Sequence, residues 1–136
     1  MMLKYYRVPL LALMAALIAI AGAPRAYAGP MGVSSTMPTF KNGVLVDERG
    51  MTLYVFSKDG TGVSNCNGKC AAIWPPLLAP SDKSAASAEF SIVTRKDGAK
   101  QWAYKGQPLY LFTRDTAPGQ KNGNGVKGLW TVVRLR

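Results

Sequence analysis

The residues whose type and spacing most readily suggest chemistry are the only two cysteines of the chain, Cys66 and Cys70. Cysteines this close in sequence can form a disulfide in an oxidising compartment if the segment between them is a turn or a frayed helix. The alternative is a redox-active pair or a metal site built on thiolates. The pair lacks the C-x-x-C spacing of thioredoxin-like motifs, and no histidine follows it as in haem attachment. The spacing therefore favours a structural disulfide.

Side chains that commonly carry catalysis are scarce. The chain contains no histidine, which removes the commonest general base and metal ligand. No motif brings two of the seven acidic residues into one cleft, so a glycosidase-type carboxylate pair has no support. The ligands of a catalytic zinc ion are also missing. We therefore expect no catalytic residue, no metal ligand and no cofactor, and predict that the protein is not an enzyme.

Two weaker patterns resemble ligand sites. Met31, Met37 and Met51 could bind copper(I) through their thioethers, but Met51 is expected to pack in the core and the other two fall in an N-terminal tail. Residues 123–128 match G-x-G-x-x-G. A dinucleotide site needs a helix and a second strand after this motif, and only eight residues follow Gly128. We interpret residues 123–128 as part of a connecting loop.

A ten-residue segment occurs twice in the chain. Residues 50–59 (GMTLYVFSKD) and 106–115 (GQPLYLFTRD) share the pattern G-x-x-L-Y-x-F-x-x-D at a spacing of 56 residues. The same spacing relates Trp74 to Trp130. Internal repeats of this kind indicate two copies of one structural unit, here about residues 41–80 and 97–136.

Each copy is predicted to contain a β-hairpin, because two β-branched or aromatic runs flank a glycine turn. The paired runs are residues 44–46 and 52–56 in the first copy, and 101–104 and 109–112 in the second. Alternation along these strands places rings on one face and leucine or valine on the other, so both faces are apolar and buried. The sequence predicts an all-β domain, a small sandwich or barrel built from two hairpin repeats, with a short helical turn near the cysteine pair.

The aromatic residues and the motif aspartates are the remaining candidates for a site. The aspartate that ends each motif could accept a backbone N–H two residues further on and fix a turn. The rings are expected to form the core, because each buries a large area, although an exposed subset could stack on sugars or other rings. These motif residues, structural with binding as the alternative, are Tyr54, Phe56, Asp59, Trp74, Trp102, Tyr110, Phe112, Asp115 and Trp130.

The motif at residues 53–59 and the segment CNGKCAAIWPPL at 66–77 together resemble a bacterial secreted-repeat family of unknown function, described as predicted lipoproteins with a Yx(F/W/Y)xxD motif. The resemblance runs from about Val44 to Arg134. It implies a small extracytoplasmic bacterial protein with no established activity. No cysteine precedes Cys66, so the lipid-attachment cysteine of lipoprotein members is missing and the chain is lipoprotein-like only.

The N-terminal residues predict export. Lys4 and Arg7 precede an apolar run at 8–23, and Ala26-Tyr27-Ala28 suits signal-peptidase cleavage before Gly29. An uncleaved membrane anchor is the alternative, but sixteen apolar positions fall short of the roughly 20 that a spanning helix needs. We predict a signal peptide at 1–28, a flexible tail at 29–40 and a single domain at 41–136, located in the periplasm or secreted and without a transmembrane segment.

The composition favours anionic partners. Cleavage would leave 14 of the 17 Lys and Arg residues against seven acids, a net charge of +7. Such a charge suits lipid headgroups, lipopolysaccharide phosphates or acidic wall polymers, or it simply keeps the domain soluble. Export argues against nucleic acid as a partner, and we expect a monomer.

These observations favour a non-enzymatic envelope or secreted module that binds a partner. A redox or metal-handling protein that uses Cys66 and Cys70 is the alternative from another class. A purely structural role without a small ligand is the third hypothesis.

Overall fold

The structure is a computed structural model that describes residues 33–81 and 87–136. The predicted signal peptide and residues 29–32 of the predicted tail lie outside the described residues. Within them, no helix is both long and apolar enough to cross a membrane. The elements in chain order are β1 (Thr39–Lys41), β2 (Val44–Val46), β3 (Tyr54–Phe56), α1 (Lys69–Ile73), β4 (Phe90–Thr94), β5 (Lys100–Tyr104), β6 (Gln107–Pro108), the 3₁₀ turn η1 (Val126–Gly128) and β7 (Trp130–Val132).

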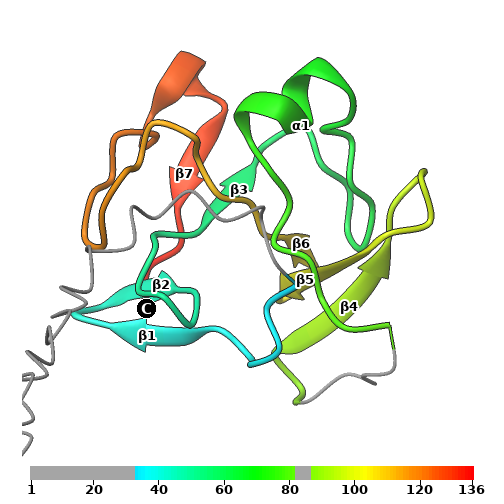
Figure 1. Cartoon of the computed structure of the whole chain (residues 1–136), viewed down its shortest axis with the longest axis horizontal. Helices are drawn as coiled ribbons and strands as arrows, with labels where there is room; N and C mark the ends of the chain where they lie inside the picture. Colours follow the sequence, from blue (N-terminus) through cyan, green and yellow to red (C-terminus); the bar gives the residue numbers. More distant parts are fainter. Residues whose placement is uncertain (1–32, 82–86) are drawn as a thin grey trace, which may run out of the picture.

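The strands form three small antiparallel sheets (Figure 1). β1 pairs with β2, β3 pairs with β7, and β5 lies between β4 and β6. The predicted all-β class is therefore confirmed, and so is the helical segment near the cysteines, although α1 has only five residues. The strands of the described residues do not close into a barrel.

The first predicted hairpin forms at its turn and then opens. The Asp47 carboxylate accepts the N–H groups of Arg49 and Met51, both at 2.9 Å, and fixes the turn that follows β2. Beyond the bridge from Val46 to Thr52, the chain leaves β2, and β3 pairs instead with β7 of the second copy. β7, the last strand of the second copy, is thus the partner of β3 in the first copy.

The second predicted hairpin is shorter than expected. β5 turns at Lys105 and Gly106 into β6, which ends at Pro108 rather than running through residues 109–112. The reason is that Tyr110 pairs with the other copy: its N–H and C=O bond to the C=O and N–H of Tyr54, both at 2.9 Å.

Alternation along the motif divides the core into two clusters, as predicted. Leu53, Leu109 and Leu111 belong to a largely aliphatic cluster that also holds Trp102. The side chains of Tyr54 and Tyr110, which are fully buried, belong to a second cluster rich in rings. The motif rings therefore lie in these two clusters, all of them buried except Phe56, which is half-buried.

The described part of the predicted flexible tail packs on the domain. Ser34 is buried, and its N–H donates to the Leu78 carbonyl at 2.9 Å. Its own carbonyl accepts the indole N–H of Trp102 at 3.2 Å. A buried indole usually has such an acceptor. Ser34 therefore makes contacts that were not expected of a flexible tail, because the Trp102 indole of β5 bonds to its carbonyl.

Candidate functional site

The two copies meet where their motif strands cross. Tyr54 and Tyr110 form an antiparallel bridge, so the segments that carry them run in opposite directions. An approximate two-fold axis at this bridge relates the two tyrosines. Each side chain then reaches into the other copy. The Tyr54 hydroxyl donates to Asp115 Oδ2 at 2.5 Å, and the Tyr110 hydroxyl donates to Asp59 Oδ2 at 2.7 Å. The motif is therefore a reciprocal exchange of tyrosine–aspartate hydrogen bonds.

The second oxygen of each aspartate closes a loop in its own copy. Asp59 Oδ1 accepts the N–H of Asn65 at 2.7 Å, and Asp115 Oδ1 accepts the N–H of Asn122 at 2.9 Å. Each asparagine also donates its side-chain amide to the carbonyl that precedes the aspartate. The predicted contact with an N–H two residues on is wrong: the bonds reach six and seven residues ahead, because both loops fold back over the aspartate.

Burial raises the pKa values of the tyrosines and of Asp59 in this network. It raises the pKa of Tyr110 to about 12, and the hydrogen bond to the Asp59 carboxylate adds to the effect. It also raises the pKa of Tyr54, helped by the bond to Asp115. The pKa of Asp59 is raised by burial too, although the Asn65 N–H and the Tyr110 hydroxyl oppose that shift. The two hydroxyls therefore remain protonated donors well into the alkaline range.

The aromatic rings of the motif form a continuous stack across both copies. Trp74 and Trp130 lie face to face at 3.8 Å between centroids and 3° between planes. Phe112 covers the far side of Trp74 at 4.1 Å, and Phe56 covers the far side of Trp130 at 4.4 Å. The order is thus one phenylalanine, two indoles and one phenylalanine, with one ring of each type from each copy.

Cys66 and Cys70 form the predicted disulfide, with 2.03 Å between the sulfur atoms and 5.2 Å between the Cα atoms. Cys66 is fully buried, and Cys70 is half-buried in α1. No group of three or more His, Cys, Asp or Glu side chains within residues 33–81 and 87–136 is placed to hold a metal ion. The geometry gives the redox and metal alternative no support.

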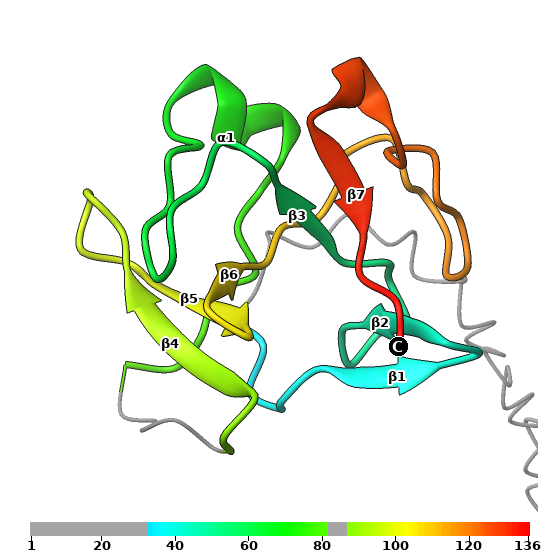
Figure 2. The same ribbon diagram turned by 180° about the vertical axis from the view of Figure 1, so that it is seen from behind.

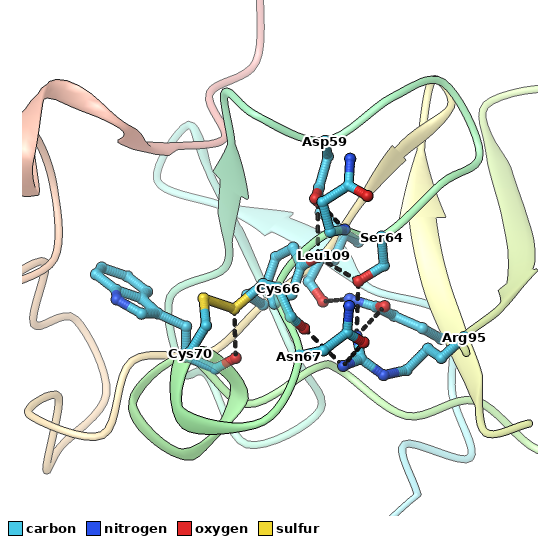
Figure 3. The surroundings of a disulfide bond; sticks show 11 residues. Asp59, Ser64, Cys66, Asn67, Cys70, Arg95 and Leu109 are labelled. Atoms are coloured by element: carbon cyan, nitrogen blue, oxygen red, sulfur yellow. Dashed lines mark hydrogen bonds between the residues drawn. A yellow bond between two sulfur atoms is a disulfide. The ribbon is translucent and has the colours of Figure 1, made fainter. Parts of the chain in front are cut away.

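Arg95 is a functional candidate that sequence reasoning missed. It is buried, and its Nη2 donates to the Cys66 carbonyl at 2.7 Å and to Asn67 Oδ1 at 3.3 Å (Figure 3). Its Nη1 donates to Ser64 Oγ and to Gln101 Oε1, both at 2.8 Å. The guanidinium thus holds the disulfide loop against β5. An isolated arginine after a strand carries no sequence signal for this role.

A chain of hydroxyl groups connects Arg95 to the motif. Ser64 Oγ lies 2.6 Å from the Tyr110 hydroxyl, which itself donates to Asp59. Ser64 therefore donates to Tyr110 while it accepts from Arg95. The second copy has no such serine, and the N–H of Gly123 donates to the Tyr54 hydroxyl at 3.2 Å instead.

The nine predicted motif residues fall into three groups. Tyr54, Tyr110 and the two aspartates form the exchanged pairs, and the four stacked rings pack beside them. Trp102 lies apart from both groups, in the aliphatic cluster, where its indole N–H binds Ser34.

Comparison with known proteins agrees with this two-copy structure. A family model described as "Secreted repeat of unknown function" matches residues 38–78 and 91–134, one segment for each copy. No curated protein and no solved structure matches the chain. The two matched segments cover more than half of the sequence. The chain therefore belongs to this family of secreted repeats of unknown function.

Proposed function

We propose that the protein is an exported, non-enzymatic binding module whose basic surface recognises anionic components of the bacterial envelope. Membership in a secreted family and a disulfide both suggest export, since disulfides persist in oxidising compartments. The motif side chains satisfy one another inside the fold. This supports a structural role for the tyrosine–aspartate pairs, whereas exposed charged side chains lie at the surface, where a partner can reach them.

The observation that carries the proposal is the unequal burial of charge. Asp47 and Asp115 are buried and Asp59 is half-buried, each holding backbone N–H groups. Arg95 is the one buried cation of the described residues. Ten lysines and arginines of residues 33–81 and 87–136 are exposed, against three acids, Glu48, Glu89 and Asp97. Folding thus hides carboxylates and presents a surface dominated by cations, which attracts polyanions.

The test is retention of the mature protein on three anionic targets: vesicles containing phosphatidylglycerol, lipopolysaccharide and an acidic wall polymer. We expect retention at low salt that weakens at moderate salt, because exposed charges are screened over about 10 Å at 0.1 M ionic strength. Vesicles of phosphatidylcholine alone are the control and should retain little protein. Failure to bind any of the three anionic targets at low salt would contradict the proposal.

A further inference from the structure

A cavity of about 660 Å³ lies between α1 and η1, and the four rings of the aromatic stack line it. Figures 1 and 2 show these two segments together at one end of the molecule. We propose that this cavity binds the aliphatic chain of a single-chain anionic amphiphile, a long-chain carboxylate. This inference rests on the proposed function as a binding module and names its ligand class.

The cavity is built from equivalent positions of the two copies. Its walls come from four residue pairs that share the 56-residue spacing of the repeat: Phe56 and Phe112, Cys70 and Val126, Ile73 and Leu129, Trp74 and Trp130. All eight side chains are apolar, with Cys70 tied into the disulfide. Ile73 is 50% exposed, so an apolar wall faces solvent. The volume lies within the range of about 300–1,000 Å³ that small-molecule sites occupy.

The charge at the mouth of the cavity selects an anion. Lys69, Arg114 and Lys127 line the cavity with exposed side chains. Among residues 33–81 and 87–136, no aspartate or glutamate lines it. Three cations around an apolar pocket without a carboxylate complement a ligand with an apolar body and a negative head.

The stacked rings favour an aliphatic body over an aromatic one. Both faces of Trp74 are covered, by Trp130 and by Phe112, and both faces of Trp130 are covered by Trp74 and Phe56. The indoles therefore offer no free face on which a planar ligand could stack. A flexible hydrocarbon chain needs no free ring face, and the cations that line the same cavity suit a terminal carboxylate.

The disulfide loop holds one wall of the cavity in place. Cys70 lines the cavity and is bound to Cys66, whose carbonyl accepts from Arg95. The α1 wall is thus fixed by a covalent bond and by a buried guanidinium. Such preorganisation reduces the entropy that a ligand must overcome on binding.

The experiment titrates the mature protein with dodecanoate below its critical micelle concentration, followed by tryptophan fluorescence and calorimetry. Dodecyltrimethylammonium and dodecyl maltoside present the same chain with a cationic or a neutral head. We expect dodecanoate to bind and the two analogues to bind at least about tenfold more weakly, a difference of about 1.4 kcal/mol. Equal binding of all three, or no binding of dodecanoate, would overturn the inference.

A pair of matched variants locates the site. Ile73→Asp places a carboxylate in the cavity wall, whereas Val63→Asp makes the same change at a residue that is 52% exposed and does not line the cavity. Dodecanoate affinity should fall by about tenfold or more in the first variant and stay unchanged in the second. Unchanged affinity in Ile73→Asp would place the ligand elsewhere and overturn the inference.

The two proposals fail separately. Loss of dodecanoate binding with vesicle retention intact would overturn the cavity assignment and leave the basic surface as the binding element. Dodecanoate binding without retention on any anionic envelope target would support the cavity and contradict the surface proposal.

Discussion

The Tyr54 hydroxyl lies 2.5 Å from a carboxylate oxygen of Asp115, a residue 61 positions further along the chain. Tyr110 and Asp59 form the converse pair at 2.7 Å. Neither copy pairs its own tyrosine with its own aspartate, because each buried hydroxyl finds its carboxylate in the other copy. The duplicated motif therefore fastens the two copies together, and each copy depends on the other for its stability.

The Tyr110 side of this exchange predicts a measurable loss of stability. Tyr110→Phe removes the donor to the half-buried Asp59 and the acceptor of the buried Ser64, so both groups lose a partner. We expect the free energy of unfolding in urea to fall by about 1–3 kcal/mol or more. Tyr104→Phe is the matched control, because the Tyr104 hydroxyl has no hydrogen-bond partner among residues 33–81 and 87–136. Equal stability of the two variants would contradict the prediction.

The motif periodicity predicts the fold class and the separation of rings and leucines onto two faces of the motif strands. Alternation in Leu53-Tyr54 and Leu109-Tyr110 placed the leucines and tyrosines in separate clusters, because side chains of a strand alternate between faces whatever their partner strand. These features depend on local pattern alone.

The pairing between copies could not be predicted from the same pattern. Local sequence makes β2 and β3 look like a hairpin, but β3 pairs with β7, and Tyr110 pairs with Tyr54. These contacts join residues far apart in sequence and are decided by the packing of the rings. The stretch from the motif aspartate to the asparagine is one residue longer in the second copy, so Asn65 corresponds to Asn122 although the motif spacing is 56. Arg95 lies outside both motifs, and only the packed structure reveals its partners.

Stability should depend on pH in the alkaline range. The pKa of Tyr110 is raised from 10.0 to about 12 by burial, so the folded state holds this proton more tightly than the unfolded state. The contribution is fully present below pH 10 and is lost as the pH rises through about 12. It amounts to about 3 kcal/mol at one pKa unit per 1.36 kcal/mol.

Urea unfolding at a series of alkaline pH values measures this loss, with phenolate absorbance as a second signal. Tyr110→Phe is the control, since it lacks the group that titrates while keeping the lysines. The wild-type protein should lose more stability than the variant between pH 10 and about 12. Parallel pH profiles of the two proteins would show that Tyr110 does not contribute.

The aromatic stack predicts a strong requirement for glycine at position 123. A Cβ added at Gly123 would lie 2.6 Å from the Trp74 ring and 3.0 Å from Phe112. The Trp74 ring is held between two other rings and has little room to move. Gly123→Ala should therefore cost about 1–3 kcal/mol of overpacking strain. At Gly60 the nearest atom to an added Cβ is 3.4 Å away, so Gly60→Ala, the control, should change stability by only about 0.5 kcal/mol.

The disulfide and Arg95 both hold the same loop, and we predict that Arg95 contributes more. The Cys66→Ser, Cys70→Ser double variant removes a crosslink over a very short loop, which costs about 2 kcal/mol in the chain-entropy model. Arg95→Met leaves several buried acceptors unsatisfied, each worth about 1–3 kcal/mol. Unfolding in urea should rank Arg95→Met as the less stable protein. The reverse ranking would mean that the covalent bond is the main restraint.

The most direct test of the exchanged motif is a double-mutant cycle on Tyr54→Phe and Asp115→Asn, measured by urea unfolding. If the copies are fastened by this pair, the single variants lose stability and the double variant loses less than their sum. The coupling energy should then lie in the range of about 0.5–3 kcal/mol found for residues in one hydrogen-bond network. Additive losses, with a coupling near zero, would contradict the claim that the motif holds the two copies together.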